Sequence, residues 1–333
     1  GVNLFFIISG LVMYQTYFGR SGESHFVGSF LIKRYARLLP LILVIVLLTS
    51  RHVGLFKAAN VNLTPFEMLI GITLLFGFFP SHNGGPVMAS WSIGVEMIFY
   101  LFFPLMMKWL RKLDALVVSL VLTLALSFFF QLGIGQIAGA TSYYYATNIF
   151  LFLPCFCYGG LLYLLPRFES REGLRRWLLL GVCLLVLYAA ATLYLMNPRW
   201  IADLVGVAEM TYWYKIQLFS LAFALVLYVQ SHSPSVMVVN RFTLYLGRLS
   251  YGIYLIHPPV IIYSKIYLLP WLSQRANGDP NLIFLSFGAV VALISVGLAE
   301  ILYRSVEHPG IRLGGMLADR WKARSEIKLK HAG

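Results

Sequence analysis

A carboxylate lies inside an apolar stretch that is long enough to form a membrane-spanning helix. Ser92, Glu96 and Tyr100 follow one another at intervals of four within residues 91–104, so they fall on one helix face. An ionised carboxylate in hydrocarbon is costly unless it is paired, solvated or protonated. This polar face therefore predicts a cavity in which chemistry takes place, or an interhelical hydrogen bond that only holds the helices together.

Two arginines offer a different kind of chemistry. Arg34 and Arg37 lie three residues apart in the stretch 30–40, which puts them on one face of a helix. Two guanidinium groups at that spacing suit a phosphate or pyrophosphate group. The alternative is a pair of basic anchors that reach to the membrane interface.

A histidine and two hydroxyl groups share a face in the stretch 246–259. Ser250, Tyr254 and His257 project along one side of the helix that this stretch predicts. A histidine is rare in a membrane span and titrates near neutral pH. Tyr254 and His257 are therefore candidates for contact with a substrate, and the alternative is a histidine that is hydrogen-bonded to a neighbouring helix.

Near the end of the last apolar segment, the charges favour structural ion pairs. Glu300 and Arg304 are spaced i, i+4, and Arg304 and Glu307 are spaced i, i+3. We interpret both pairs as a lock at the cytoplasmic end of that helix. Cys155 and Cys157 are interpreted as small buried apolar residues, because no cluster in the sequence has metal-ligand spacing.

The composition indicates that the helices carrying these residues lie in a membrane. The chain has 333 residues, of which 59% are hydrophobic and 12% charged, whereas soluble domains carry about 25% charged residues. We predict an all-α, polytopic integral membrane bundle with about nine to ten spans. The apolar segments fall at 1–18, 38–56, 66–80, 92–109, 115–133, 148–165, 177–196, 214–230, 249–264 and 283–303.

The chain has a net charge of +13, and the positions of its basic residues predict how it is oriented in the membrane. The basic residues lie in short connections and in the C-terminal tail, where they meet anionic lipid headgroups; nothing in the sequence suggests nucleic-acid binding. Loops 19–37 and 51–65 are both basic, so we expect a re-entrant or short segment near 38–50 between them. The prediction is one transmembrane domain over 1–310 and a basic cytoplasmic tail over 311–333.

Five stretches, taken in order along the chain, resemble the signatures of one family. They look like its Gly-Val-Asp-Leu-Phe-Phe-x-x-Ser-Gly opening, its Arg-x-x-Arg-x-x-Pro element, its Trp-Ser-x-x-x-Glu element and its last two signatures. The stretches are Gly1 to Gly10, Lys33 to Pro40, Trp91 to Pro104, Gly247 to Pro259 and Tyr303 to Pro309. The chain thus resembles the membrane-bound acyltransferase type 3 family.

This resemblance implies transfer of an acyl group, often acetyl, from cytoplasmic acyl-CoA to a hydroxyl of a cell-surface glycan or glycolipid. It implies a bacterial-type inner membrane, with acyl-CoA as a substrate and no bound cofactor. The family's Arg-x-x-Arg pair is associated with acyl-CoA, so Arg34 and Arg37 take that role. The catalytic candidates are Glu96, Asn3 and Ser92, and the further substrate-binding candidates are Tyr100, Tyr254 and His257.

The chain departs from the family pattern at its start. Asn3 stands where the family usually has Asp, and an amide cannot stabilise an imidazolium by charge. The family's catalytic histidine lies on a helix before this motif, and neither His25 nor His257 occupies that place. We expect upstream sequence to be missing, and we expect weak catalysis without that helix.

Two other classes of function compete with acyl transfer. A transporter or flippase for a glycan-linked lipid or small solute would use the buried Glu96, His257 and Glu300 as a relay. A structural subunit would need no chemistry at all. The acyltransferase reading in turn predicts a polar passage through the bundle that joins Arg34 and Arg37 to Glu96.

Overall fold

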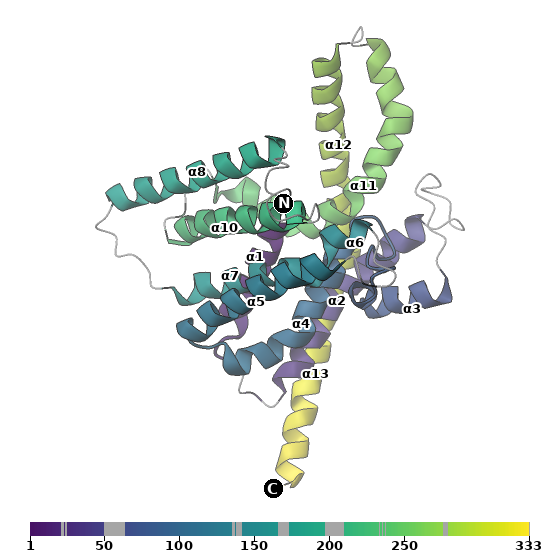
Figure 1. The fold of residues 1–333 in the computed structure, drawn as a ribbon. Helices are drawn as coiled ribbons and strands as arrows, with labels where there is room; N and C mark the ends of the chain where they lie inside the picture. The colour runs from purple at the N-terminus through teal and green to yellow at the C-terminus, as the bar shows by residue number, and fades with distance from the viewer. Residues whose placement is uncertain are drawn as a thin grey trace. The chain divides into compact units, whose positions relative to one another are not determined.

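The computed structural model of the chain is built from helices (Figure 1). It describes residues 1–20, 23, 25–49, 64–134, 137, 142–165, 173–196, 210–232, 234, 236, 238–275 and 279–332. The chain divides into two compact units. The first contains Gly1–Glu23, Phe79–Asn83 and Val95–Val239, and the second contains Ser24–Phe78, Gly84–Gly94 and Asn240–Gly333.

The first unit is a bundle of apolar helices. Its helices are α1 (Val2–Tyr17), most of α4 (Trp91–Trp109), α5 (Leu113–Gly133), α6 (Ser142–Thr147), α7 (Ile149–Leu164), α8 (Gly173–Met196) and α10 (Met210–His232). Helix α7 packs against α1, α5 and α10, and α8 packs against α10. The expected spans at 1–18, 92–109, 115–133, 148–165, 177–196 and 214–230 all correspond to these helices.

Two glycines let α1 and α7 approach closely. A Cβ atom built on Gly159 would lie 2.4 Å from the backbone oxygen of Ile7, and one on Gly10 would lie 2.6 Å from the oxygen of Phe156. Small residues at such positions are typical of helix pairs in membranes, where close backbone packing replaces the hydrophobic effect. Phe156 in turn stacks on Phe99 of α4, with ring centroids 3.9 Å apart.

The second unit contains the arginine pair and the end of the chain. Its helices are α2 (Phe26–Thr49), α3 (Pro65–Thr73), the 3₁₀ turn η2 (Phe76–Phe78), α11 (Arg241–Arg275), α12 (Pro280–Leu302), the π-helical turn η4 (Tyr303–Glu307) and α13 (His308–Ala332). Helices α11 and α12 form an antiparallel hairpin, and α13 continues from α12 and lies beside α2 (Figure 1).

The segment expected to be re-entrant is part of a longer helix. Helix α2 has 24 residues and continues through Pro40 to Thr49 without a reversal of direction. Its length is about 36 Å at 1.5 Å per residue. Residues 50–63 lie outside the described residues, so the topology predicted for loop 51–65 stays a prediction.

The apolar segment 66–80 does not form one spanning helix. Helix α3 has 9 residues and ends at Leu74, whose φ of 57° is left-handed, before the turn η2 begins. A helix of this length covers about 14 Å, less than half of a hydrocarbon core of about 30 Å. Hydropathy alone could not show this break, because Leu74 is as apolar as its neighbours.

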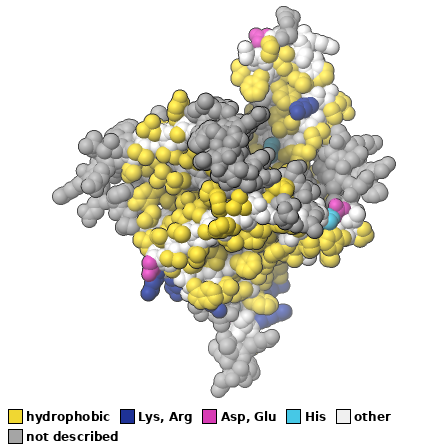
Figure 2. Space-filling model, in the orientation of Figure 1, with side chains coloured by type: hydrophobic (Ala, Val, Ile, Leu, Met, Phe, Trp, Pro, Cys, Tyr) yellow, Lys and Arg dark blue, Asp and Glu magenta, His cyan; other side chains and the backbone are white. Residues whose placement is uncertain are grey.

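The surface of the described chain is apolar, as a lipid environment requires. Figure 2 shows apolar side chains over much of the visible face. Within the described residues, six helices are long and apolar enough to cross a membrane. They span Trp91–Trp109, Leu113–Gly133, Tyr143–Leu164, Trp213–Ser231, Arg241–Arg275 and Pro280–Ile327. The protein is therefore an integral membrane protein of the predicted all-α class, and the expected count of nine to ten spans stays a prediction.

Candidate active site

Glu96 of α4 is held by two hydroxyl groups in the first unit. The hydroxyl of Ser9 in α1 donates a hydrogen bond of 2.7 Å to Glu96 Oε1. The hydroxyl of Tyr100, one turn further along α4, donates to the same oxygen. The two hydroxyls are themselves 3.2 Å apart. Glu96 and Tyr100 lie on one helix face, as predicted, and the hydrogen bond between them and the contact with Ser9 form a compact polar triangle.

The other carboxylate oxygen is the chemically useful one. Glu96 is half-buried, and among the described residues no hydrogen-bond partner contacts its Oε2. One oxygen therefore fixes the side chain while the other can accept a hydrogen bond from a ligand. A fixed carboxylate of this kind can orient a hydroxyl group or a base that removes its proton.

Aromatic contacts fix α1 against α4 beside this triangle. The hydroxyl of Tyr14 donates a hydrogen bond of 3.1 Å to the carbonyl of Leu110, just after α4. The Tyr14 ring also meets Phe103 edge-on at 6.0 Å, and Tyr17 meets Phe103 at 6.4 Å. These contacts hold Ser9, one to two turns earlier in α1, at a set distance from Glu96.

Asn3, predicted to be catalytic, is used to join helices. Its amide nitrogen donates to the carbonyl of Ile216 and to the hydroxyl of Ser220 in α10, at 3.0 Å in each case. The Ser220 hydroxyl is also 3.2 Å from the sulfur of Cys155. Both amide hydrogens are engaged, and 7% of Asn3 is exposed. The structure therefore gives Asn3 an interhelical role, and its catalytic assignment stays a prediction.

Ser92 forms a hydrogen bond with Tyr254, whereas Glu96 is bonded by Ser9 and Tyr100. In the second unit the Ser92 hydroxyl donates a hydrogen bond of 2.9 Å to the hydroxyl of Tyr254 in α11. Nδ1 of His257 lies 2.8 Å from the carbonyl of Tyr254 and 3.2 Å from that of Ile253, one turn earlier in the same helix. If Nδ1 carries the proton, Nε2 is left as an acceptor.

The arginine pair lies in the second unit on a helix that is braced from several sides. Arg34 is 9% exposed, and its guanidinium lies 5.6 Å from the centre of the Phe30 ring. The hydroxyl of Tyr35 donates to the carbonyl of Thr73 at 2.5 Å. Tyr251 of α11 likewise donates to the Leu38 carbonyl at 2.7 Å. The turn that carries Arg34 and Arg37 is thus fixed on both sides.

Only one of the two expected ion pairs near the chain end forms among the described residues. Glu300 and Arg304 are paired as predicted. Glu307, however, is 1% exposed, whereas 78% of the Arg304 side chain is exposed. The π-helical turn Tyr303–Glu307 explains the difference, because its wider winding places the two residues on different faces.

The candidate residues thus fall into separate groups. Asn3, Glu96 and Tyr100 belong to the first unit, whereas the second contains Arg34, Arg37, Ser92, Tyr254 and His257. The passage predicted between the arginines and Glu96 joins the two units and stays a prediction. Within the described residues, no three His, Cys, Asp or Glu side chains are grouped so that they could hold a metal ion.

Ser9 is the site residue that the sequence reasoning missed. Ser9 belongs to the opening motif, but nothing in the sequence links its hydroxyl to Glu96, because 87 positions separate the two residues. A serine next to Gly10 in an apolar helix is the signal that could have found it, since polar residues beside small ones face helix interfaces.

Comparison with known proteins agrees with the motifs. Residues 1–300 match the profile of the acyltransferase domain family, acyltransferase 3. Relatives named putative O-acetyltransferase occur in Staphylococcus aureus strains COL, MSSA476 and MRSA252, each 25% identical over 118 residues. The aligned part covers 32% of this chain and 20% of each relative, so the chain matches only about a fifth of their length. No solved structure matches. The chain therefore belongs to the acyltransferase 3 family.

Proposed function

We propose that the protein transfers an acyl group, acetyl foremost, from acyl-CoA to a hydroxyl of a cell-envelope glycan or glycolipid. The family supports acyl transfer, and the relatives' names support an O-acetyl product. The observation that carries the proposal is the half-buried Glu96, anchored through Oε1 by Ser9 and Tyr100. Of the two activities that the sequence leaves open, family membership favours this one over transport.

At the acyl carbon the reaction forms one bond and breaks one, and a proton moves from the acceptor hydroxyl to CoA. The acceptor oxygen attacks the thioester carbonyl, a carbon–oxygen bond forms, and the carbon–sulfur bond breaks. A base removes the proton of the acceptor hydroxyl, and a proton is returned to the sulfur of CoA. In this scheme Oε2 of Glu96 accepts a hydrogen bond from the acceptor hydroxyl or from the base. General-base assistance of this kind contributes about 10²–10⁴ in rate.

Arg34 and Arg37 are proposed to bind the phosphates of the donor. Arginine forks match phosphate oxygens with two parallel hydrogen bonds, and the braced helix keeps both side chains in register. The expected cytoplasmic C-terminus would place this pair on the side where acyl-CoA occurs. Exposed basic residues on α13, among them Arg312, Arg320 and Lys322, support that orientation, and a bacterial-type inner membrane is the proposed location.

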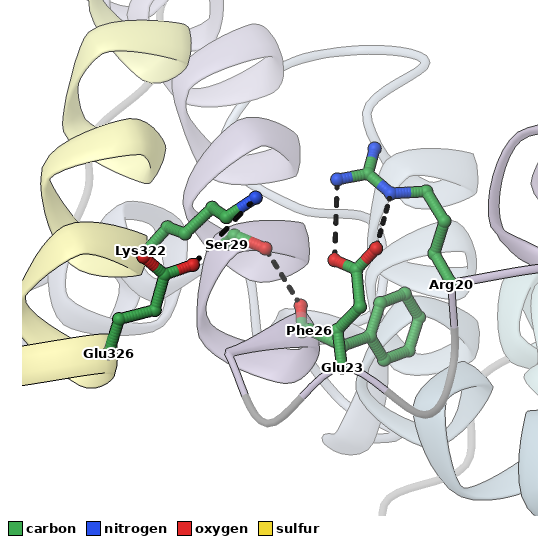
Figure 3. A network of polar contacts seen from close by, with 6 residues as sticks. All are labelled: Arg20, Glu23, Phe26, Ser29, Lys322 and Glu326. Carbon is green, nitrogen blue, oxygen red and sulfur yellow. Dashed lines mark hydrogen bonds and ion pairs between the residues drawn. The ribbon is translucent and has the colours of Figure 1, made fainter. Parts of the chain in front are cut away.

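The test is transfer of labelled acetyl from acetyl-CoA to envelope glycan in membranes that contain the protein. Glu96→Gln keeps the shape of the side chain and removes its charge, so we expect turnover to fall about 100-fold or more. The matched control is Glu23→Gln, which removes an exposed partner of Arg20 (Figure 3) and should leave turnover unchanged.

A second arm of the experiment tests the donor site. Arg34→Ala and Arg37→Ala should each raise the KM for acetyl-CoA, and the double variant should raise it further. Wild-type membranes that transfer no acetyl to any envelope fraction would contradict the proposed reaction. Glu96→Gln protein with wild-type turnover would contradict the role of the carboxylate, and unchanged donor affinity in the double variant would contradict the donor site.

A further inference from the structure

Two consecutive prolines interrupt the hydrogen bonding of α11 in the middle of its length. Pro258 and Pro259 lie inside the helix Arg241–Arg275. A proline has no N–H, so Pro258 leaves the carbonyl of Tyr254 without its usual helical donor. Pro259 does the same to the carbonyl of Leu255. Inside a membrane such carbonyls need other donors, so this turn of α11 presents backbone acceptors that an unbroken helix would not.

His257 bonds the first of these two carbonyls. Its Nδ1 lies 2.8 Å from the oxygen of Tyr254 and 3.2 Å from that of Ile253. A carbonyl oxygen only accepts hydrogen bonds, so Nδ1 carries the ring proton in this contact. Nε2 of the neutral ring is then an acceptor. The carbonyl that Pro258 frees therefore selects the tautomer of His257.

Nε2 of His257 is not engaged by the part of the chain that the structure describes. No hydrogen bond reaches it there, and the residue stays partly exposed between the buried neighbours Ile256 and Pro258. The histidine thus offers one oriented, neutral acceptor in an apolar helix. Such an acceptor suits the N–H or O–H group of a ligand, because a donor in apolar surroundings is costly to leave unpaired.

Ser92 and Tyr254 hold the imidazole ring before any ligand arrives. Ser92 lies in the first turn of α4, is 7% exposed and donates a hydrogen bond of 2.9 Å to the hydroxyl of Tyr254. The rings of Tyr254 and His257 are 5.9 Å apart, centre to centre. The bonded hydroxyl restricts the tyrosine ring, and the tyrosine ring restricts the imidazole beside it. Groups that are fixed in advance lose less conformational freedom on binding.

His257 lies further into the apolar part of the second unit than the arginine pair. The hydroxyl of Tyr251 in α11 bonds the carbonyl of Leu38, the residue after Arg37 in α2. His257 follows Tyr251 by six residues, which is about 9 Å along the helix axis. This direction leads away from the end of α11 that carries Arg248, and basic residues are typical of the membrane interface. A ligand held at the arginines would therefore meet His257 when it extends inward.

We propose that His257 binds the pantetheine arm of acyl-CoA, with Nε2 as the acceptor for an amide N–H of the arm. The inference rests on the proposed function, in which Arg34 and Arg37 bind the phosphates of the donor. The arm joins these phosphates to the thioester and carries amide groups, so it brings N–H donors into an apolar bundle. Each donor needs an acceptor there. His257 supplies one, and the Leu255 carbonyl in the same turn offers a second.

The alternative is a histidine that only satisfies the Tyr254 carbonyl. Asparagine separates the two roles. Its amide nitrogen takes the place of Nδ1 and can donate to the carbonyl, whereas its side chain is too short to reach the place of Nε2. Glutamine is one methylene longer and brings an amide oxygen close to that place. His257→Asn therefore keeps the structural bond and removes the proposed one.

The test is equilibrium binding of two ligands to the purified protein in detergent, measured by calorimetry. One ligand is CoA, and the other is ADP, which keeps the adenosine and the diphosphate but lacks the arm. His257→Asn should weaken CoA binding about tenfold and ADP binding by less than about twofold, because only the arm loses a partner. His257→Gln should recover part of the loss. The control is Ser273→Ala, also in α11, whose hydroxyl bonds the Leu269 carbonyl of its own helix.

Two further variants separate the arm from the phosphates and from folding. Arg34→Ala should weaken the binding of both ligands, because both carry the diphosphate. Ser92→Ala frees the Tyr254 ring while His257 stays in place, so it should weaken CoA binding a few-fold and leave ADP binding unchanged. This variant keeps the inference testable if the histidine variants do not fold.

Turnover separates binding from proton transfer. His257→Asn should raise the KM for acetyl-CoA about tenfold and leave kcat at saturation within about twofold, because binding rather than chemistry is affected. A histidine that removes the proton of the acceptor hydroxyl would behave differently. Both His257→Asn and His257→Gln would then lower kcat about 100-fold or more, and that result would overturn the inference.

The outcomes distinguish the two proposals. A wild-type protein that binds neither CoA nor ADP and transfers no acetyl group would overturn the proposed function. A wild-type protein that binds CoA, together with His257→Asn protein of unchanged CoA affinity, would overturn this inference alone and leave the histidine a structural role. Equal losses of CoA and ADP binding in His257→Asn would overturn it as well, because the arm would not be the part that is recognised.

Discussion

The hydroxyl of Ser9 lies 2.7 Å from the carboxylate of Glu96, although 87 positions separate the two residues in the sequence. This hydrogen bond joins the opening motif of the chain to the Trp-Ser-x-x-x-Glu stretch. Tyr100 bonds the same oxygen, so a carboxylate in an apolar helix is fixed from two sides. The geometry explains why a serine and a glutamate from distant motifs belong to one site.

Removing the Ser9 hydroxyl should weaken the site without unfolding it. We expect Ser9→Ala to lower acetyl transfer about tenfold, because one hydrogen bond to a charged group contributes about 1.5–3 kcal/mol. Tyr100→Phe should behave alike, and the double variant should lose more than the sum of both. The control is Ser119→Ala, because the Ser119 hydroxyl contacts the sulfur of Cys157, at 3.6 Å, and not Glu96. Full activity of the double variant would contradict this arrangement.

Restoring the family's usual aspartate at position 3 should destabilise this protein. Asn3→Asp removes both donors to Ile216 and Ser220 and places an acceptor against a carbonyl. We expect a loss of about 1–3 kcal/mol in the free energy of unfolding. Thermal unfolding in detergent measures it, with Ser220→Ala as a milder partner variant. Higher activity at an unchanged melting temperature would show that position 3 acts in catalysis instead.

The contact between α1 and α7 should tolerate no side chain at Gly159. The added methyl group of Gly159→Ala would lie 2.4 Å from the Ile7 carbonyl oxygen, so the helices must separate. Overpacking of this kind costs about 1–3 kcal/mol or more. Gly181→Ala in α8 is the matched control, because nothing lies within 4 Å of its Cβ position. Equal melting temperatures for the two variants would argue against this packing.

The docking of α13 can be tested in the same way. Gly310→Ala should lower the melting temperature, because the added methyl group would lie 2.7 Å from the Ala36 carbonyl oxygen and push α13 away from α2. Gly315→Ala has nothing within 4 Å and should be neutral, or stabilising by up to about 1 kcal/mol through helix propensity. A neutral Gly310→Ala variant would contradict the tight contact between α13 and α2.

Most of the helices are predictable from the sequence, because their apolar runs are long and polar residues are rare; the break at Leu74 and the uninterrupted course of α2 are not. The common helix face of Glu96 and Tyr100 follows from their spacing of four residues, whereas the hydrogen bond between them is seen only in the structure. The position of Glu307 did not follow, because the sequence spacing to Arg304 assumes a regular α-helix and the chain winds more widely there. The partner of Asn3 could not be predicted either, since helix order in a bundle is set by packing between distant segments such as α1 and α10.

The π-helical turn at Tyr303–Glu307 has a consequence for how this segment can vary. Each residue of an α-helix turns the chain by about 100°, and the wider winding of this turn already absorbs one extra residue. A further single-residue insertion between the turn and Gly310 would not be absorbed, and it would rotate Gly310 and Gly314 by that angle, away from α2. The number of residues between the π-helical turn and these glycines is therefore constrained, and one inserted residue there should do more harm than most substitutions.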